Sequence, residues 1–184
     1  MEFLRKSFIS GGCIYSLYND EKPKDYDFFL TSTTLAAKLR EHFMDASGYH
    51  GSNMSGGTYN NLPLIITDNA ISVGKYQIIT RWVGTPEEVV GQFDFEHLQC
   101  FYYGGELASL SSLDSLKSKD LKYNEKRARD IVGTVMRTNR FVQRGMRISC
   151  KEMSKILLKL NEVGFSEREL ETLNNAQSDR HFSS

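Results

Sequence analysis

The chain has 184 residues, of which 40% are hydrophobic and 25% are charged. This composition excludes a wholly disordered chain, and the length suits one globular domain or one domain with a helical appendage. No apolar run approaches the roughly 20 residues of a membrane-spanning helix, and residues 1–10 lack the apolar stretch of a signal peptide, so we expect a cytoplasmic protein. Three widely spaced cysteines, Cys13, Cys100 and Cys150, exclude a disulfide framework and a Cys-x-x-Cys metal site.

The formal net charge is zero, but the charges are unevenly distributed. Residues 117–159 contain 13 Lys or Arg against 4 Asp or Glu, an excess of nine positive charges, whereas residues 1–116 are net acidic. A basic segment of this kind indicates a polyanionic partner, either a nucleoside triphosphate or a nucleic acid backbone. The alternative interpretation is a solvated helix surface that carries Lys and Arg.

The first half of the chain alternates between strand and helix patterns. A short strand is predicted to end at residues 8–10, where Gly11 and Gly12 form a turn before a helix over 13–18. The pattern then predicts a strand over 25–31, a helix over 33–44, a loop over 46–61 and strands over 62–67, 70–73 and 75–83.

The second half begins with a strong helix start at Thr85, because Thr85 can cap the helix and Pro86 suits its first position. A long strand over 92–103 and a hairpin turn at Gly104-Gly105 follow. From Leu107 onward the period is helical. Helices are predicted over about 125–143 with Asn124 as the cap, and over 150–162 and 167–175 after two capping boxes. The fold class is therefore α+β, with an α+β part over 1–110 and a helical part over 111–184.

Two carboxylates lie on one face of the strand predicted over 25–31. Side chains alternate between the faces of a strand, so Asp25 and Asp27 point the same way and Tyr26 the other. Adjacent carboxylates repel each other unless a cation lies between them. The pair therefore indicates a site for Mg²⁺ or Mn²⁺ that substrate phosphates complete, although many exposed strand ends carry such a pair without any ligand.

A glycine turn precedes this strand. Glycine lets backbone N–H groups approach a phosphate closely, so Ser10, Gly11 and Gly12 are the candidate phosphate-binding residues. Asp94 is the third candidate carboxylate, because it lies between Phe93 and Phe95 in a predicted strand, where Asp is uncommon. It could complete the metal site and accept the proton of an attacking hydroxyl, or it could simply face solvent.

The stretch ISGGCIYSLYNDEKPKDYDFFL resembles the head motif of the polymerase-β-type nucleotidyltransferases, in which a glycine pair, a short helix and a polar loop precede a strand bearing Asp-x-Asp. It is most similar to the heads of CCA-adding enzymes and bacterial poly(A) polymerases, and to small nucleotidyltransferases of bacteriophages. MRTNRFVQRGMRIS, residues 136–149, is similar to the arginine-rich helix that follows this head. The resemblance implies a mixed-sheet head and places Arg137 and Arg140 toward substrate phosphates.

Two departures from the CCA-adding pattern stand out. Tyr15-Ser16 occupies the position of that family's Arg-Asp pair, and its acidic-arginine motif for choosing CTP or ATP has no clear counterpart. The resemblance implies a metal-dependent enzyme that transfers a nucleoside monophosphate from an NTP to an acceptor hydroxyl.

The acceptor is open. The basic segment favours an RNA 3′ end, such as that of tRNA. The alternatives are AMP transfer to a protein or small molecule, and a non-catalytic module that binds nucleotide or RNA.

Overall fold

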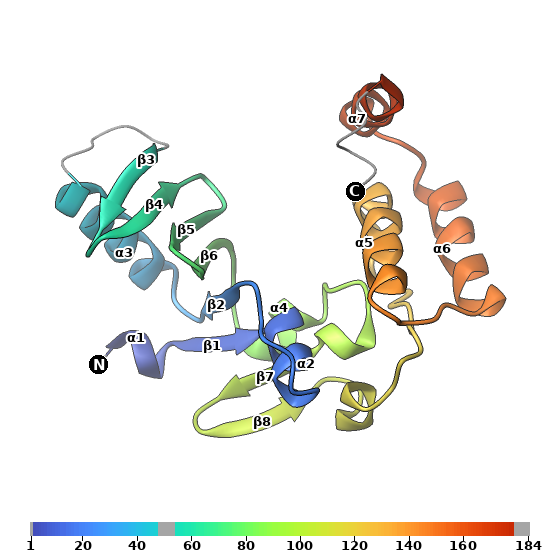
Figure 1. Ribbon diagram of the computed structural model, residues 1–184, viewed down its shortest axis with the longest axis horizontal. Coiled ribbons are helices and arrows are strands. Elements are labelled where there is room, and N and C mark those ends of the chain that lie inside the picture. The colour runs from blue at the N-terminus through green and yellow to red at the C-terminus, as the bar shows by residue number, and fades with distance from the viewer. Residues whose placement is uncertain (1, 48–53, 179–184) are drawn as a thin grey trace. The chain divides into compact units, whose positions relative to one another are not determined.

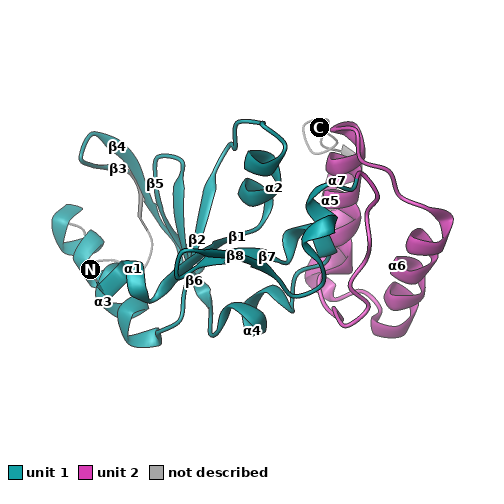
Figure 2. Ribbon diagram, turned by 90° about the horizontal axis from the view of Figure 1, so that it is seen from below, with its two compact units in different colours: residues 1–118 teal, residues 119–184 magenta. Residues whose placement is uncertain are grey.

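The computed structural model describes residues 2–47 and 54–178. It divides the chain into two compact units, residues 1–118 and 119–184 (Figure 2). The first unit carries the sheet, and the described part of the second unit contains α-helices without a named strand.

The first unit contains an eight-stranded sheet in the part that the structure describes, with the order β3-β4-β5-β6-β2-β1-β7-β8 (Figure 1). Neighbouring strands are antiparallel except β2 and β6, which run parallel, so the sheet is mixed and the predicted α+β class is confirmed. The strands are β1 Ser7–Ser10, β2 Tyr26–Leu30, β3 Met54–Tyr59, β4 Leu62–Ile66, β5 Ala70–Val73, β6 Tyr76–Val83, β7 Cys100–Tyr103 and β8 Glu106–Ser109.

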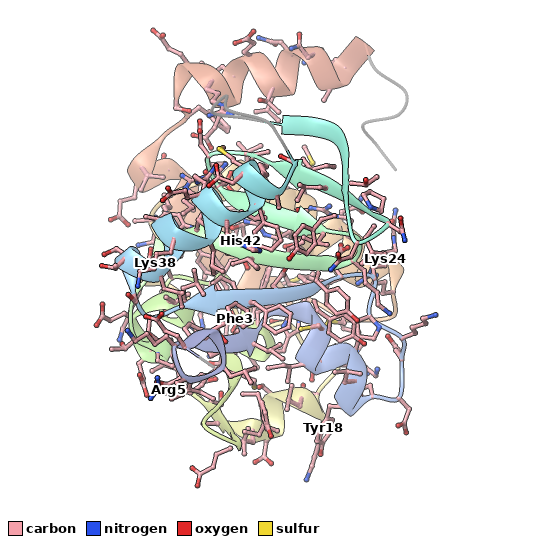
Figure 3. All side chains as sticks on the ribbon, turned by 90° about the vertical axis from the view of Figure 1, so that its left-hand side faces the viewer. Phe3, Arg5, Tyr18, Lys24, Lys38 and His42 are labelled. Atoms are coloured by element: carbon pink, nitrogen blue, oxygen red, sulfur yellow. The ribbon has the colours of Figure 1, made fainter. Side chains whose placement is uncertain are left out.

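Helices cover both faces of this sheet, and the alternation along β2 explains how. Phe28 packs with the buried cluster of α3, whereas its neighbour Phe29 packs with the cluster that contains Val89 and Val90 of α4. Figure 2 shows α2 and α4 on opposite sides of the strands. Phe3 of α1 adds a ring contact to Phe28, with centroids 5.7 Å apart (Figure 3). The helical segments are α1 Glu2–Arg5, α2 Gly12–Tyr18, α3 Thr33–Ser47, α4 Pro86–Val90 and the 3₁₀ helices η1 Glu96–Leu98 and η2 Leu113–Leu116.

The second unit contains α5 Ile131–Gln143, α6 Cys150–Val163 and α7 Glu167–Ser178. Side-chain caps begin these helices, as the capping boxes predict for the last two. Ser149 accepts a hydrogen bond from the Glu152 amide. Ser166 and Glu169 exchange hydrogen bonds at the start of α7.

The predicted long strand over 92–103 is wrong for most of its length. After α4 the chain turns, bends at residues 93–94, is extended at Phe95 and forms η1, so β7 is the only named strand in this range. Phe95 is fully buried, and Phe93 packs against Phe29 with ring centroids 5.5 Å apart. Phe93 and Phe95 thus pack into the core from a bend, and their spacing of two residues gives the same sequence pattern as a strand with one buried face.

Three further boundaries differ from the prediction. The helix expected from residue 125 begins only at Ile131, because Asp130, with a φ of 49°, caps it, whereas Asn124 caps a single turn. Residues 106–109 form β8 rather than helix. The predicted loop over 46–61 contains β3, which pairs with β4, while its residues 48–53 lie outside the described part of the chain.

Candidate active site

The end of β1 brings the glycine turn beside the carboxylate strand. Ser10, the last residue of β1, pairs directly with Asp27 of β2. Gly11 follows with a φ of 89°, and a Cβ atom on Gly11 would lie 3.7 Å from Oδ2 of Asp27. A Cβ on Gly12 would meet open space. The backbone at Gly12 is therefore accessible to a ligand, and the neighbouring Gly11 lies close to the carboxylate of Asp27.

Asp27 carries an unusual carboxylate, both in its hydrogen bonding and in its pKa. Its Oδ1 atom is buried and has no hydrogen-bond partner among the residues that the structure describes. Burial, and then the charge of Asp25, raise the pKa of Asp27 from 3.8 to about 6. Asp25 itself is exposed and immediately precedes β2. A buried carboxylate oxygen without a donor beside a second carboxylate fits Mg²⁺ or Mn²⁺, which prefer oxygen ligands.

The side chain of Ser10 is used by the fold. It is fully buried, and its hydroxyl donates to the carbonyl oxygen of Cys100 at 2.7 Å. Cys13, in the first turn of α2, donates from its thiol to the Ser10 carbonyl at 3.5 Å. The phosphate role that the sequence suggests for Ser10 would therefore fall to its backbone rather than to its hydroxyl.

Asp94 is buried rather than solvent-facing, with 2% of its surface exposed. Its carboxylate acts on His97, whose pKa burial lowers to about 4 against the raising effect of Asp94. His97 in turn lies edge-on to Tyr15 of α2, with ring centroids 5.0 Å apart. Within residues 2–47 and 54–178, no three His, Cys, Asp or Glu side chains gather closely enough to hold a metal ion. The third-ligand role of Asp94 stays a prediction.

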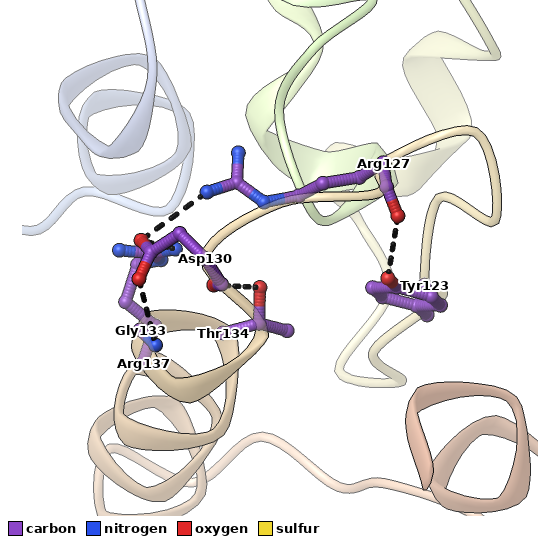
Figure 4. A network of polar contacts seen from close by, with 6 residues as sticks. All are labelled: Tyr123, Arg127, Asp130, Gly133, Thr134 and Arg137. Carbon is purple, nitrogen blue, oxygen red and sulfur yellow. Dashed lines mark hydrogen bonds and ion pairs between the residues drawn. The ribbon is translucent and has the colours of Figure 1, made fainter. Parts of the chain in front are cut away.

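The two arginines named by the sequence both lie on α5 in the second unit. Arg137 and Arg127 each approach Oδ2 of Asp130 at 3.4 Å, and Asp130 also accepts the Gly133 amide that starts the helix (Figure 4). Arg140 is exposed. Arg137 thus has a structural partner, while the side chain of Arg140 is accessible to a ligand.

One polar residue beside Asp27 was not found from the sequence. Gln77 of β6 is the direct neighbour of Asp27 in the parallel pair β2 and β6. The residues around Gln77 predict a strand but do not indicate a functional role, because the parallel pairing of β6 with β2 is a property of the folded sheet.

The fold defines the class of protein. Solved structures of CCA-adding enzymes match it, among them that of Thermotoga maritima complexed with tRNA, with a TM-score of 0.57 and 16% identity over 85% of this chain and 38% of that one. A CCA-adding enzyme with ATP gives a TM-score of 0.58 at 16% identity, over 85% and 39%. A tRNA nucleotidyltransferase with a primer tRNA and an ATP analogue gives 0.54 at 15%, over 96% and 54%. The first unit therefore has the fold of a polymerase-β-type nucleotidyltransferase head, and the chain spans about half or less of these structures.

The family is given by the sequence. A sequence model of the Gabija anti-defense 2 family matches residues 2–119, which is more than half of the chain. The chain belongs to the Gabija anti-defense 2 family. No curated protein matches it. Among the described residues, no helix is both long and apolar enough to cross a membrane.

Proposed function

We propose that this protein is a metal-dependent nucleotidyltransferase that moves a nucleoside monophosphate from an NTP to an acceptor hydroxyl. The carboxylate of Asp27 is the observation that carries the proposal: its Oδ1 is buried and unpartnered among the described residues, and its Oδ2 lies 3.7 Å from the position of a Cβ on Gly11. A fold that leaves a carboxylate in this state loses stability unless a ligand compensates the charge. The likeness to nucleotidyltransferase heads supports the same reaction class.

Each residue of the site would have a distinct part. The backbone of Gly11 and Gly12 would approach the triphosphate, because neither position carries a side chain that keeps phosphate oxygens away. Asp25 and Asp27 would hold Mg²⁺ or Mn²⁺, with Asp94 as the predicted further ligand. A divalent cation bound there supplies neutralisation of the charge that develops on the phosphate oxygens. The acceptor oxygen would form a bond to the α-phosphorus, the bond to pyrophosphate would break, and the proton of the acceptor hydroxyl would pass to a carboxylate of the site, for which Asp94 is the predicted candidate.

The acceptor proposed here is an RNA 3′ end. The support is the excess of nine positive charges in residues 117–159, which suits a phosphate backbone. Several of these side chains have acidic partners, such as Arg147 with Asp120 at 3.1 Å, so exposed residues such as Arg140 would carry the contact. In a family named for anti-defense, the product of the transfer would act against the defence system.

Label transfer tests this function. The protein is incubated with each α-labelled NTP, Mg²⁺ or Mn²⁺, and either pooled tRNA or total cellular protein. We expect label on RNA with wild type, and a loss of about 10³-fold or more in Asp25→Ala and Asp27→Ala, because several kcal/mol of charge stabilisation disappear. Asp94→Ala tests the third ligand in the same assay.

Three results would oppose the proposal. Label on protein alone would favour the alternative acceptor. Transfer that all three variants retain would remove the carboxylates from the mechanism. No transfer to any acceptor, with nucleotide and RNA binding unchanged in the variants, would identify a non-catalytic binding module.

A further inference from the structure

A row of residues crosses the sheet at the level of Asp27. From β1 to β5 the partners in register are Ser10, Asp27, Gln77 and Ser72. Partners in register place their side chains on the same face of a sheet. One further step along the strands, Phe29 and Ile79 are also partners, and both pack in the cluster of α4. Asp27 and Gln77 therefore share the face that α4 covers further along.

The carboxamide of Gln77 has unused hydrogen-bonding capacity. Its side chain is partly buried and makes no hydrogen bond to any residue within 2–47 or 54–178, although an amide offers two donors and an acceptor. Other polar side chains of this sheet are used by the fold, as when Thr80 accepts a hydrogen bond from Arg40 at 2.9 Å. A half-buried amide without a partner, beside an equally unpartnered carboxylate oxygen, is available to a ligand at the same site.

The direction of the reaction gives this amide its role. Phosphoryl transfer proceeds with the attacking and leaving oxygens roughly in line. Gly11 and Gly12 lie on the β1 side of Asp27, and Gln77 lies on the β6 side. With the triphosphate over the glycine turn, pyrophosphate leaves toward β1, and the acceptor hydroxyl must approach from the side of β6.

We propose that Gln77 hydrogen-bonds the acceptor hydroxyl and orients it toward the α-phosphorus. This inference rests on the proposed function, and it assigns the acceptor side of the site to β6 and β5. The amide oxygen accepts a hydrogen bond from the acceptor hydroxyl, or the amide N–H donates one to the hydroxyl oxygen. Either bond fixes the position of the hydroxyl without adding charge to the site. Ser72 of β5 pairs with Gln77 and is a further polar residue on the side from which the acceptor would approach.

A binding experiment tests this role without requiring turnover. Two RNA minihelices that differ only in the terminal ribose, one intact and one 2′,3′-dideoxy, are titrated by fluorescence anisotropy with Mg²⁺ and α,β-methylene ATP, which cannot transfer its nucleotide. Wild type is expected to bind the intact end about threefold to tenfold more tightly, the value of one hydrogen bond. Gln77→Ala and the similarly sized Gln77→Met should bind both RNAs equally, with affinity for α,β-methylene ATP within twofold of wild type.

The control is Tyr76→Ala, which removes an exposed side chain from the adjacent position on the opposite face and should retain the preference. A wild type that binds both ends equally, or Gln77 variants that keep the preference, would overturn the assignment. A large loss of α,β-methylene ATP affinity in Gln77→Met, with the RNA preference intact, would also overturn it and place Gln77 on the nucleotide side. If the preference depends on Gln77 but no label is transferred, the acceptor contact stands and the proposed function fails.

Discussion

Two carboxylates with buried oxygen atoms, one in each unit, differ in the hydrogen bonds that the fold gives them. Glu152 of α6 is 2% exposed, and its oxygens accept the Tyr123 amide at 2.9 Å and the Lys155 ammonium at 3.0 Å. Burial works to raise the pKa of Glu152, but these hydrogen bonds and the nearby lysines outweigh it, and the pKa is lowered. Asp27 has no such partner for Oδ1, and its pKa is raised to about 6. The fold supplies hydrogen-bond donors to both oxygens of Glu152, whereas it supplies none to Oδ1 of Asp27 among the described residues.

The largest effect is expected at the satisfied carboxylate. Glu152→Ala leaves the Tyr123 amide and Lys155 without their acceptor, so the free energy of unfolding of the second unit should fall by about 3 kcal/mol. Urea unfolding followed by circular dichroism measures this loss. The control is Glu162→Ala, which removes an exposed ion pair with Lys159 and should cost less than about 1 kcal/mol. Equal losses in the two variants would contradict the structural role of Glu152.

Removal of the charge of Asp27 should raise the free energy of unfolding, whereas removal of Glu152 should lower it. Because the folded-state pKa of Asp27 is raised, its ionisation opposes folding, and stability present below pH 4 is lost as the pH rises through about 6. In buffer with a chelator at pH 7.5, Asp27→Asn should therefore raise the free energy of unfolding by up to about 3 kcal/mol. Asp68→Asn, at an exposed turn, should change nothing. An Asp27→Asn variant less stable than wild type would indicate that the fold satisfies this carboxylate after all.

The smallest stability effect, and a sharp functional one, is expected at the glycine turn. Gly11→Ala places a side chain at a φ of 89°, which should cost about 1–3 kcal/mol. Gly12→Ala adds a methyl group to open space in a helical residue, so stability should be unchanged or slightly higher. Affinity for α,β-methylene ATP should nevertheless fall in Gly12→Ala, because the methyl group occupies the approach of the phosphates. Unchanged affinity would show that the triphosphate lies elsewhere.

The sequence predicts local features well. The capping residues Ser149 and Ser166, the Gly11 turn and the Asp-x-Asp strand all follow from a few neighbouring residues, and the resemblance to nucleotidyltransferase heads adds the mixed sheet. The strand predicted around Asp94 was wrong because the alternation of Phe93 and Phe95 is the same whether a strand or a bend buries them. The helix expected at Asn124 failed for a related reason, since Asp130 competes as a cap and adopts a left-handed backbone.

What the sequence could not supply is long-range pairing. The neighbour of Asp27 on one side is Ser10 and on the other Gln77, fifty residues further along the chain. The burial of Asp27, and with it the raised pKa, likewise depends on packing from distant elements. The neighbours of Asp27 and its raised pKa therefore cannot be predicted from the sequence, because both depend on strand pairing and burial in the folded sheet.

Titration with Mn²⁺ shows whether the carboxylate of Asp27 binds a metal ion. Electron paramagnetic resonance measures free Mn²⁺ during titration of the protein in the presence of α,β-methylene ATP. Wild type is expected to bind Mn²⁺ in excess of what the nucleotide alone holds, and Asp27→Asn should weaken that binding at least tenfold, whereas Asp68→Asn should not. Identical Mn²⁺ affinity in wild type and Asp27→Asn would contradict the assignment of Asp27 as a metal-binding residue.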